Sequence, residues 1–336
     1  MKRCAALVSM VLMASAAVSG CSGDGDDGPS IVVYNAQHEQ LLDEIAPLFE
    51  KETGIQVELR NGSDSELAAQ LIQEGDASPA DVFLTENSPA MSAVERAGLF
   101  TKLDDATTAP IPEQYRPTSG LWTGFVARST VLFYNPDLVA QADLPASILD
   151  LADPRYDGLI SFSPTGADFQ AIVAAVLELK GEDATRDWLA GLAANGTVYD
   201  GNNVVLESVN AGESAMGIAY HYYWYRDQAE SGEVSDNTEL HFFGKQDPGA
   251  FLSVSGAGVL ASSDNADEAQ QFVKFLTGEE GQQALADSYA LEYPLNPAVQ
   301  LAPPVKPLSE LQPPVVNVSD LDGDTVVDLM TEAGFL

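Results

Sequence analysis

The strongest constraint on the fold is the regular alternation of strand and helix signals that begins at Ile31. Short runs rich in β-branched and aromatic residues predict strands at 31–34, 55–59 and 81–84, and apolar residues at helical spacing follow each run. Further strands are predicted near 125–126, 131–134 and 254–260. This pattern predicts an α/β fold, in which helices cover a mainly parallel sheet.

The predicted helices carry apolar residues on one face, and several of them end at a glycine. They are centred on 41–49, 67–72, 169–177, 188–192 and 272–276, with another that runs to Gly98. Residues 303–316 contain five prolines and are expected to form an irregular strap. A last helix is predicted from about Thr325 to Glu332, with Asp324 as its N-cap. The body of a little over 300 residues is long for one domain, so two lobes are expected.

The first thirty residues are predicted to serve export. Lys2 and Arg3 precede an apolar run over 5–18, which is typical of a secretory signal and too short to remain as a membrane span. The segment 18–21 (VSGC) resembles the lipobox of bacterial lipoproteins, so we expect a signal at 1–20 and a lipid on Cys21. An ordinary cleaved signal with an incidental cysteine is the alternative. The acidic, flexible linker at 21–30 favours the lipid anchor, which would hold the protein outside the cell membrane.

Composition excludes several classes of function. The formal charge is −36, and losing Lys2 and Arg3 with the signal removes two positive charges and leaves −38. Nucleic-acid binding is therefore not expected, whereas cations are favoured near the surface. The same acidity would also suit an adaptation to salt. Because Cys4 lies in the signal, the folded body after Cys21 has no cysteine for a disulfide or for thiol chemistry.

His38, Glu86 and the aromatic run at 220–225 are the features that could carry chemistry. Each also has a structural explanation. His38 falls in a turn and could be solvated, Glu86 could begin a helix, where the helix dipole favours a carboxylate, and the tyrosines could pack at a lobe surface. Taken singly, none of them establishes a function.

Six segments together are far more specific than any single residue. In chain order they are 34–38 (YNAQH), 52–55 (ETGI), 79–86 (PADVFLTE), 222–225 (YYWY), 246–250 (QDPGA) and 292–295 (EYPL). They resemble the bacterial ferric-ion-binding proteins, the substrate-binding components of iron(III) ABC importers, and the resemblance extends from Ile31 to the C-terminus.

The resemblance implies a two-lobe periplasmic-binding-protein fold of class II type, with the ligand cleft between the lobes. One lobe would comprise 31–130 plus 253–302, and the other 131–252 plus 303–336. In that family the iron is held by a histidine, a glutamate, two adjacent tyrosines and an exogenous anion. These positions fall on His38, Glu86, Tyr222 and Tyr223.

The chemistry of these residue types agrees with that cargo. Ferric iron is a hard trication, and two phenolates with one carboxylate offset its charge while an imidazole completes the set. Tyrosine ionises near a pKa of about 10, so the metal must displace the phenol protons and binding should weaken in acid. Adjacent side chains on a strand point to opposite faces, so we expect a loop or a helix start at Tyr222 and Tyr223.

The anion site departs from the family pattern. The residues that correspond to it are Asn87, Thr165, Gly166, Ala167, Asn202 and Tyr220. Backbone N–H groups at 165–167 precede a predicted helix and could receive an anion. Asn87 is shorter and Tyr220 bulkier than the family's residues, so carbonate or another small oxyanion is as plausible as phosphate.

The expected protein is a monomeric, non-enzymatic receptor that delivers ferric iron to an ABC transporter permease. Two alternatives remain at this stage. The same fold could bind another oxyanion or a metal chelate, although paired phenols bring nothing to an anion receptor. A mononuclear iron oxygenase could use similar ligands, but such enzymes favour two histidines with one carboxylate and open coordination positions.

Overall fold

The computed structural model describes residues 28–336. The predicted signal at 1–20, Cys21 and most of the 21–30 linker therefore lie outside the described residues. Within 28–336, no helix is both long and apolar enough to cross a bilayer.

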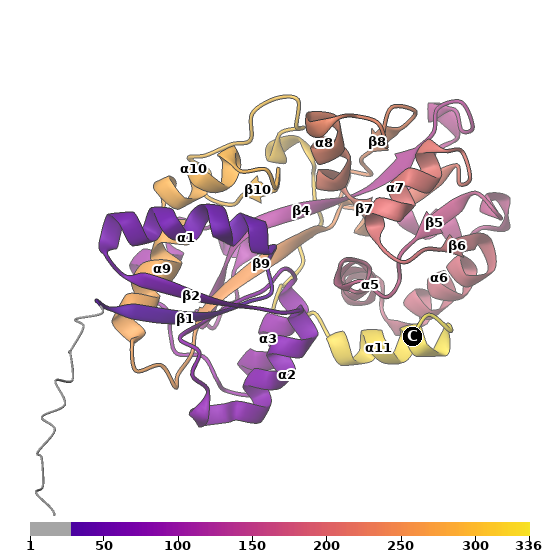
Figure 1. The fold of residues 1–336 in the computed structure, drawn as a ribbon. Helices are drawn as coiled ribbons and strands as arrows, with labels where there is room; N and C mark the ends of the chain where they lie inside the picture. The colour runs from indigo at the N-terminus through magenta and orange to yellow at the C-terminus, as the bar shows by residue number, and fades with distance from the viewer. Residues whose placement is uncertain (1–27) are drawn as a thin grey trace, which may run out of the picture.

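The strands form a mixed sheet in two halves that are joined through one long strand (Figure 1). The order along the sheet is β2-β1-β3-β9-β4-β7-β5-β6, and β8 and β10 also pair with β4. The strands are β1 (Ser30–Asn35), β2 (Gln56–Asn61), β3 (Val82–Leu84), β4 (Trp122–Tyr134), β5 (Ile160–Phe162), β6 (Gly196–Val198), β7 (Met216–Tyr220), β8 (Glu239–His241), β9 (Leu252–Val259) and β10 (Tyr293–Pro294).

Helices cover both faces of each half. The first half carries α1 (Glu39–Thr53), α2 (Asp64–Glu74), α3 (Ser88–Arg96), α4 (Asp105–Thr108), α9 (Ala266–Thr277) and α10 (Glu279–Asp287). The second half carries α5 (Ala167–Lys180), α6 (Glu182–Asn195), α7 (Asn202–Asn210), α8 (His221–Glu230) and α11 (Gly323–Glu332). All of the helices predicted from the sequence are present, and α4, α7 and α10 are additional. The last helix is capped by Asp322, whose side chain accepts from the N–H groups of Asp324 and Thr325, so the prediction of Asp324 as N-cap was wrong.

Each half has a core of its own, and Tyr225 of α8 also packs into the core of the first half. On one face of the first sheet, α1, α9 and α10 pack over β1, β3 and β9, and on the other face α2 and α3 cover the same strands (Figure 1). In the second half α5, α6 and α11 pack on one face, and α7 lies against β4 and β7 on the other. This division into two α/β bodies agrees with the predicted fold class.

β4 belongs to both halves. Residues 122–129 pair antiparallel with β9, and residues 130–134 pair antiparallel with β7. The sequence predicted two strands near 125–126 and 131–134, which was wrong because they are one strand. Arg128 and Ser129 interrupt the apolar pattern between them, although every residue of β4 is buried.

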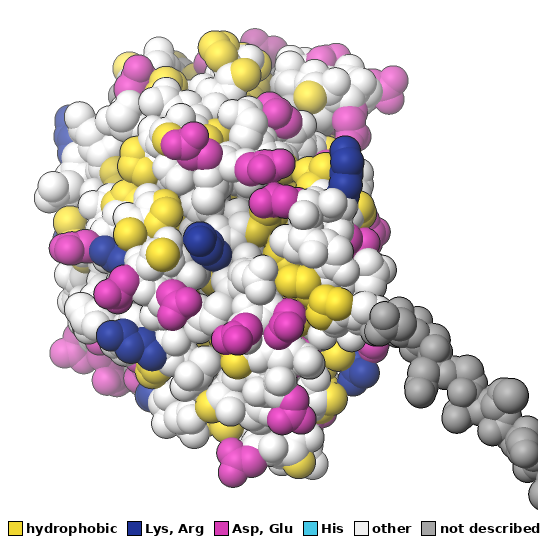
Figure 2. Space-filling view, turned by 90° about the vertical axis from the view of Figure 1, so that its left-hand side faces the viewer, with side chains coloured by type: hydrophobic (Ala, Val, Ile, Leu, Met, Phe, Trp, Pro, Cys, Tyr) yellow, Lys and Arg dark blue, Asp and Glu magenta, His cyan; other side chains and the backbone are white. Residues whose placement is uncertain are grey.

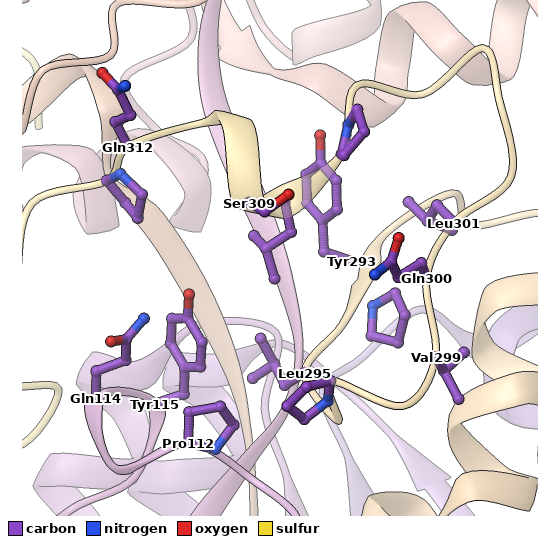
Figure 3. A pocket seen from close by; sticks show the side chains of 15 residues that line it. Pro112, Gln114, Tyr115, Tyr293, Leu295, Val299, Gln300, Leu301, Ser309 and Gln312 are labelled. Atoms are coloured by element: carbon purple, nitrogen blue, oxygen red, sulfur yellow. The ribbon is translucent and has the colours of Figure 1, made fainter.

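The strap at 303–316 is irregular apart from a short 3-10 turn, as predicted. Val305 and Leu311 pack into the first half, and Val316 packs into the second. A cavity of about 370 Å³ lies between the strap and the first half (Figure 3). Tyr115 and Tyr293 contribute to its walls together with leucines and prolines.

Acidic side chains are scattered over the surface. Figure 2 shows them spread across the face that it presents, with basic side chains lying singly between them. This distribution agrees with the net charge of −36 and shows no basic stripe on that face for a phosphate backbone.

Candidate metal centre

The four predicted metal ligands come from two halves of the molecule. His38 follows β1 and immediately precedes α1, and Glu86 lies between β3 and α3. Because β1 and β3 are parallel neighbours, their carboxyl ends bring these two residues to the same edge of the sheet. Tyr222 and Tyr223 lie in the first turn of α8, so the predicted helix start at this pair is confirmed.

The structure brings these residues together. The His38 Nε2 atom lies 3.7 Å from Glu86 Oε1, and the ring centroids of His38 and Tyr222 are 5.5 Å apart. The rings of Tyr222 and Tyr223 stack with centroids 4.2 Å apart. An imidazole, a carboxylate and two phenols therefore meet where the two halves face each other.

Several buried polar atoms at this meeting point have no hydrogen-bond partner. They are His38 Nε2, the Tyr222 hydroxyl, one oxygen of Asp168 and one oxygen of Glu292. Buried polar atoms in proteins are nearly always paired, so a group of unpaired ones requires an explanation. All four can offer a lone pair, and this donor set fits a hard metal cation.

Burial shifts the pKa values of these groups strongly. It raises the pKa of Glu86 to about 7, with Arg128 acting in the opposite direction and the neighbouring carboxylates Asp64 and Glu292 adding to the rise. Burial also raises the pKa of Tyr222 and of Tyr223 well above the usual value for a phenol. Without a compensating positive charge, the site therefore favours its protonated forms.

Asp168 is part of the site, and the sequence analysis missed it. It is almost fully buried in the first turn of α5, where its Oδ2 atom accepts from the Tyr223 hydroxyl at 2.9 Å and from Asn202 Nδ2 at 2.9 Å. Burial raises the pKa of Asp168 to about 7, and the nearby Glu86 adds to that rise. A carboxylate in a helix's first turn usually reflects the helix dipole, so nothing in the local sequence distinguishes Asp168.

The residues predicted to bind an anion divide into two groups. Asn202 donates to Asp168 and to the Tyr223 hydroxyl, the Tyr220 hydroxyl donates to the backbone oxygen of Asp168, and the Asn87 side chain is held by Asp64, Arg128 and Ser253. The Asn202 amide nitrogen, the Tyr220 hydroxyl and the Asn87 side chain therefore already have protein partners.

Thr165, Gly166 and Ala167 form the second group, which leads into α5 as predicted. Thr165 and Ala167, together with Asn87, line a groove of about 440 Å³ between α2, α3, α5 and α11. None of the four predicted metal ligands lines this groove, although Asn87 directly follows Glu86.

The fold and the site together define a class of protein. Two α/β bodies joined by crossing strands, with ligand groups contributed from both sides, are the architecture of a solute-binding protein that closes around its ligand. The chain matches the model of the bacterial extracellular solute-binding proteins over residues 35–283.

Individual relatives narrow this class. The chain is 51% identical to the Fe(3+)-binding periplasmic protein of Serratia marcescens, over 99% of this chain and 97% of that protein. It is 39% identical to the major ferric iron-binding protein of Neisseria meningitidis, over 80% of this chain and 82% of that protein. The structure of iron-bound HitA from Pseudomonas aeruginosa superposes with a TM-score of 0.86 at 42% identity, over 91% of this chain and all of HitA. The chain therefore belongs to the extracellular solute-binding proteins and, among them, to the ferric-ion-binding proteins.

Proposed function

We propose that this chain captures ferric iron in the cleft between its two halves and delivers it to an ABC importer. The observation that carries the proposal is the cluster of buried, unpaired donor atoms at the meeting of His38, Glu86 and Tyr222. Tyr223 is proposed as the second phenolate. The names of the relatives from Serratia and Neisseria, which specify ferric iron, support the same cargo.

The charges of the proposed ligands suit a trication. Two phenolates and Glu86 supply three negative charges, and Asp168 supplies a fourth when all four groups are ionised. Divalent ions would leave more of this charge uncompensated in a buried site, which is costly. This set of anionic ligands therefore favours Fe³⁺ over Fe²⁺.

Asp168 is proposed as a resident anion that substitutes for phosphate or carbonate. In the iron-free protein its carboxylate accepts from Asn202 and from the Tyr223 hydroxyl. When Tyr223 ionises, the hydrogen bond from Asn202 remains, and the free oxygen of Asp168 is available to the metal. On this proposal iron binding does not depend on added phosphate or bicarbonate, whereas Asp168→Gly makes it depend on one of them. If the wild-type protein also requires an added anion, Asp168 does not have this role.

Export and anchoring complete the proposal. The protein would be held outside the membrane by a lipid on Cys21 after removal of 1–20, would act as a monomer, and would hand its iron to a membrane permease without catalysing a reaction. The proposed lobes are 31–130 plus 253–302 and 131–252 plus 303–336, and the presence of a core in each half supports this division.

The test is optical. Ferric citrate added to the iron-free protein should produce a visible phenolate-to-iron charge-transfer band, and Tyr222→Phe and Tyr223→Phe should each weaken or shift it. Tyr225→Phe is the matched control, because Tyr225 lies on the same helix but its hydroxyl accepts from the backbone N–H of Lys306. If wild-type protein shows no band, or if all three variants behave alike, the proposed ligands are wrong.

A further inference from the structure

A second buried carboxylate faces the candidate metal centre from the first half of the molecule. Glu292 immediately precedes β10 and is 1% exposed. One of its oxygens, Oε2, pairs with Arg128 Nη1 at 3.0 Å, while the other, Oε1, has no hydrogen-bond partner. That free oxygen lies 3.4 Å from His38 Nε2, closer than the 3.7 Å that separates Nε2 from Glu86.

Arg128 connects this carboxylate to the backbone around Glu86. It is fully buried in β4, and its Nη1 atom also donates to the hydroxyl of Ser255 at 2.7 Å. That hydroxyl donates in turn to the backbone oxygen of Glu86 at 3.0 Å. The guanidinium also donates to Asn87, the residue that follows Glu86, at 3.2 Å.

His38 is attached to the same network through Gln37. The side-chain amide of Gln37 donates to the Ser255 hydroxyl at 2.7 Å, and its carbonyl oxygen accepts from the backbone N–H of His38 at 2.8 Å. The backbones of both proposed ligands in the first half are therefore fixed to Arg128 and Glu292 by hydrogen bonds.

We propose that Glu292 is a positioning residue of the metal centre, which holds the backbone of His38 in place through Gln37 and adds a fixed negative charge that selects trivalent over divalent ions. This inference rests on the proposed function, because it concerns the same site. A purely structural role accounts poorly for the geometry. A buried ion pair is often no more stable than an apolar pair of similar volume, and a structural pair would use both carboxylate oxygens rather than leave one facing an imidazole.

The charge of the bound ion provides the discriminating measurement. Coulomb energy is proportional to that charge, so removing one fixed negative charge should weaken binding of a trivalent ion more than binding of a divalent one. The logarithm of the fold-loss in affinity for the trivalent ion and that for the divalent ion should be in a ratio of about 3 to 2. A change in packing or stability would lower the affinity for both ions to a similar degree.

Glu292→Gln is the suitable substitution, since it keeps the side-chain volume and an oxygen for Arg128. Affinities for Ga³⁺, which is redox-inert, and for Zn²⁺ would be measured by chelator competition on the full chain. We expect Ga³⁺ affinity to fall at least about tenfold, with a smaller loss for Zn²⁺. Equal losses for the two ions, or no loss, would overturn the proposal.

Asp81→Asn is the matched control. Asp81 is also a buried carboxylate of the first half, but it precedes β3 at the end opposite Glu86 and accepts from Val32 N at 2.7 Å and from Ser263 Oγ at 2.6 Å. This variant should change thermal stability without changing the ratio of the two affinities. If Asp81→Asn changes that ratio as Glu292→Gln does, the effect is not specific to Glu292 and the proposal fails.

A second variant covers the case in which Glu292→Gln does not fold. Glu292→Asp keeps the charge and moves it away from His38, so the loss for Ga³⁺ should again exceed that for Zn²⁺, and unchanged affinities would again contradict the proposal. The wild-type charge-transfer band separates this inference from the proposed function. If the wild-type protein shows no band, ferric binding is refuted. If it shows the band but the Glu292 variants keep the wild-type affinities for Ga³⁺ and Zn²⁺, only the role of Glu292 is refuted.

Discussion

Iron loading should release protons from the protein, and the number released follows from the buried groups at the site. The phenols of Tyr222 and Tyr223 have pKa values well above the usual range, so both are protonated near neutrality. If both are ligands, as proposed, iron displaces two protons from them. Glu86 and Asp168 each have a pKa of about 7, so together they contribute about one further proton at pH 7.

The expected release is therefore about two protons per iron at pH 9, about three at pH 7 and nearly four at pH 5. By linkage, the same number gives the slope of log affinity against pH, so one unit of acidification from pH 7 should weaken binding by about three powers of ten or more. We therefore expect iron to be held at neutral pH and released in mild acid.

Calorimetry can count these protons. Iron would be transferred from ferric nitrilotriacetate in buffers of different ionisation enthalpy, with the protons of the free chelator determined separately. Tyr222→Phe should release about one proton fewer at every pH, and Asp168→Asn about half a proton fewer at pH 7. A release below two protons at pH 9 in the wild-type protein would refute tyrosinate ligation.

Three further predictions concern stability. The pKa of Glu86 is raised, so its contribution to the stability of the iron-free protein is present below pH 4.5 and is lost as the pH rises through about 7. Glu86→Gln should therefore stabilise the iron-free protein at pH 8 by up to about 3 kcal/mol in urea unfolding while it weakens iron binding, and a destabilised variant would contradict this. Gly256→Ala places a Cβ 2.3 Å from Met91 Cγ and should cost about 1–3 kcal/mol in the same assay, so an unchanged free energy of unfolding would contradict this prediction. Ser63→Ala removes the capping box with Glu66 at the start of α2 and should lower stability by about 1 kcal/mol, so an unchanged unfolding midpoint would count against it.

The sequence predicted β1 to β4 and β9 because apolar periodicity follows burial, but it did not predict β5 to β8 or β10. The helix at 41–49 and the strand at 254–260 lie where the pattern placed them, apart from a few residues at their ends. The pattern failed in β4, where Arg128 and Ser129 are polar yet buried. Their burial depends on partners that are distant in sequence, such as Glu292, and local periodicity does not contain that information.

The same limit applies to the site. His38, Glu86 and the tyrosine pair were predicted through resemblance, and the structure brings them together. The sequence did not predict Asp168 or Glu292 as part of the site. Carboxylates in the first turn of a helix or in a loop are ordinarily solvated, so neither residue was distinguished from the others. Only the fold shows that both are buried beside the predicted ligands.

The strap gives the molecule a third connection between its halves. Near its end the strap runs beside Phe251 and Leu252, where the chain enters β9. The strap therefore lies next to the strands that cross between the two halves. Two adjacent strands can bend as a hinge about one axis. The strap is a third connecting segment, and because its prolines have fixed φ angles it resists stretching as the halves separate. The length of the strap at 303–316 should therefore limit how far the two halves separate. By limiting the opening of the cleft, the strap would also affect the rate at which iron dissociates, although it is not one of the proposed ligands.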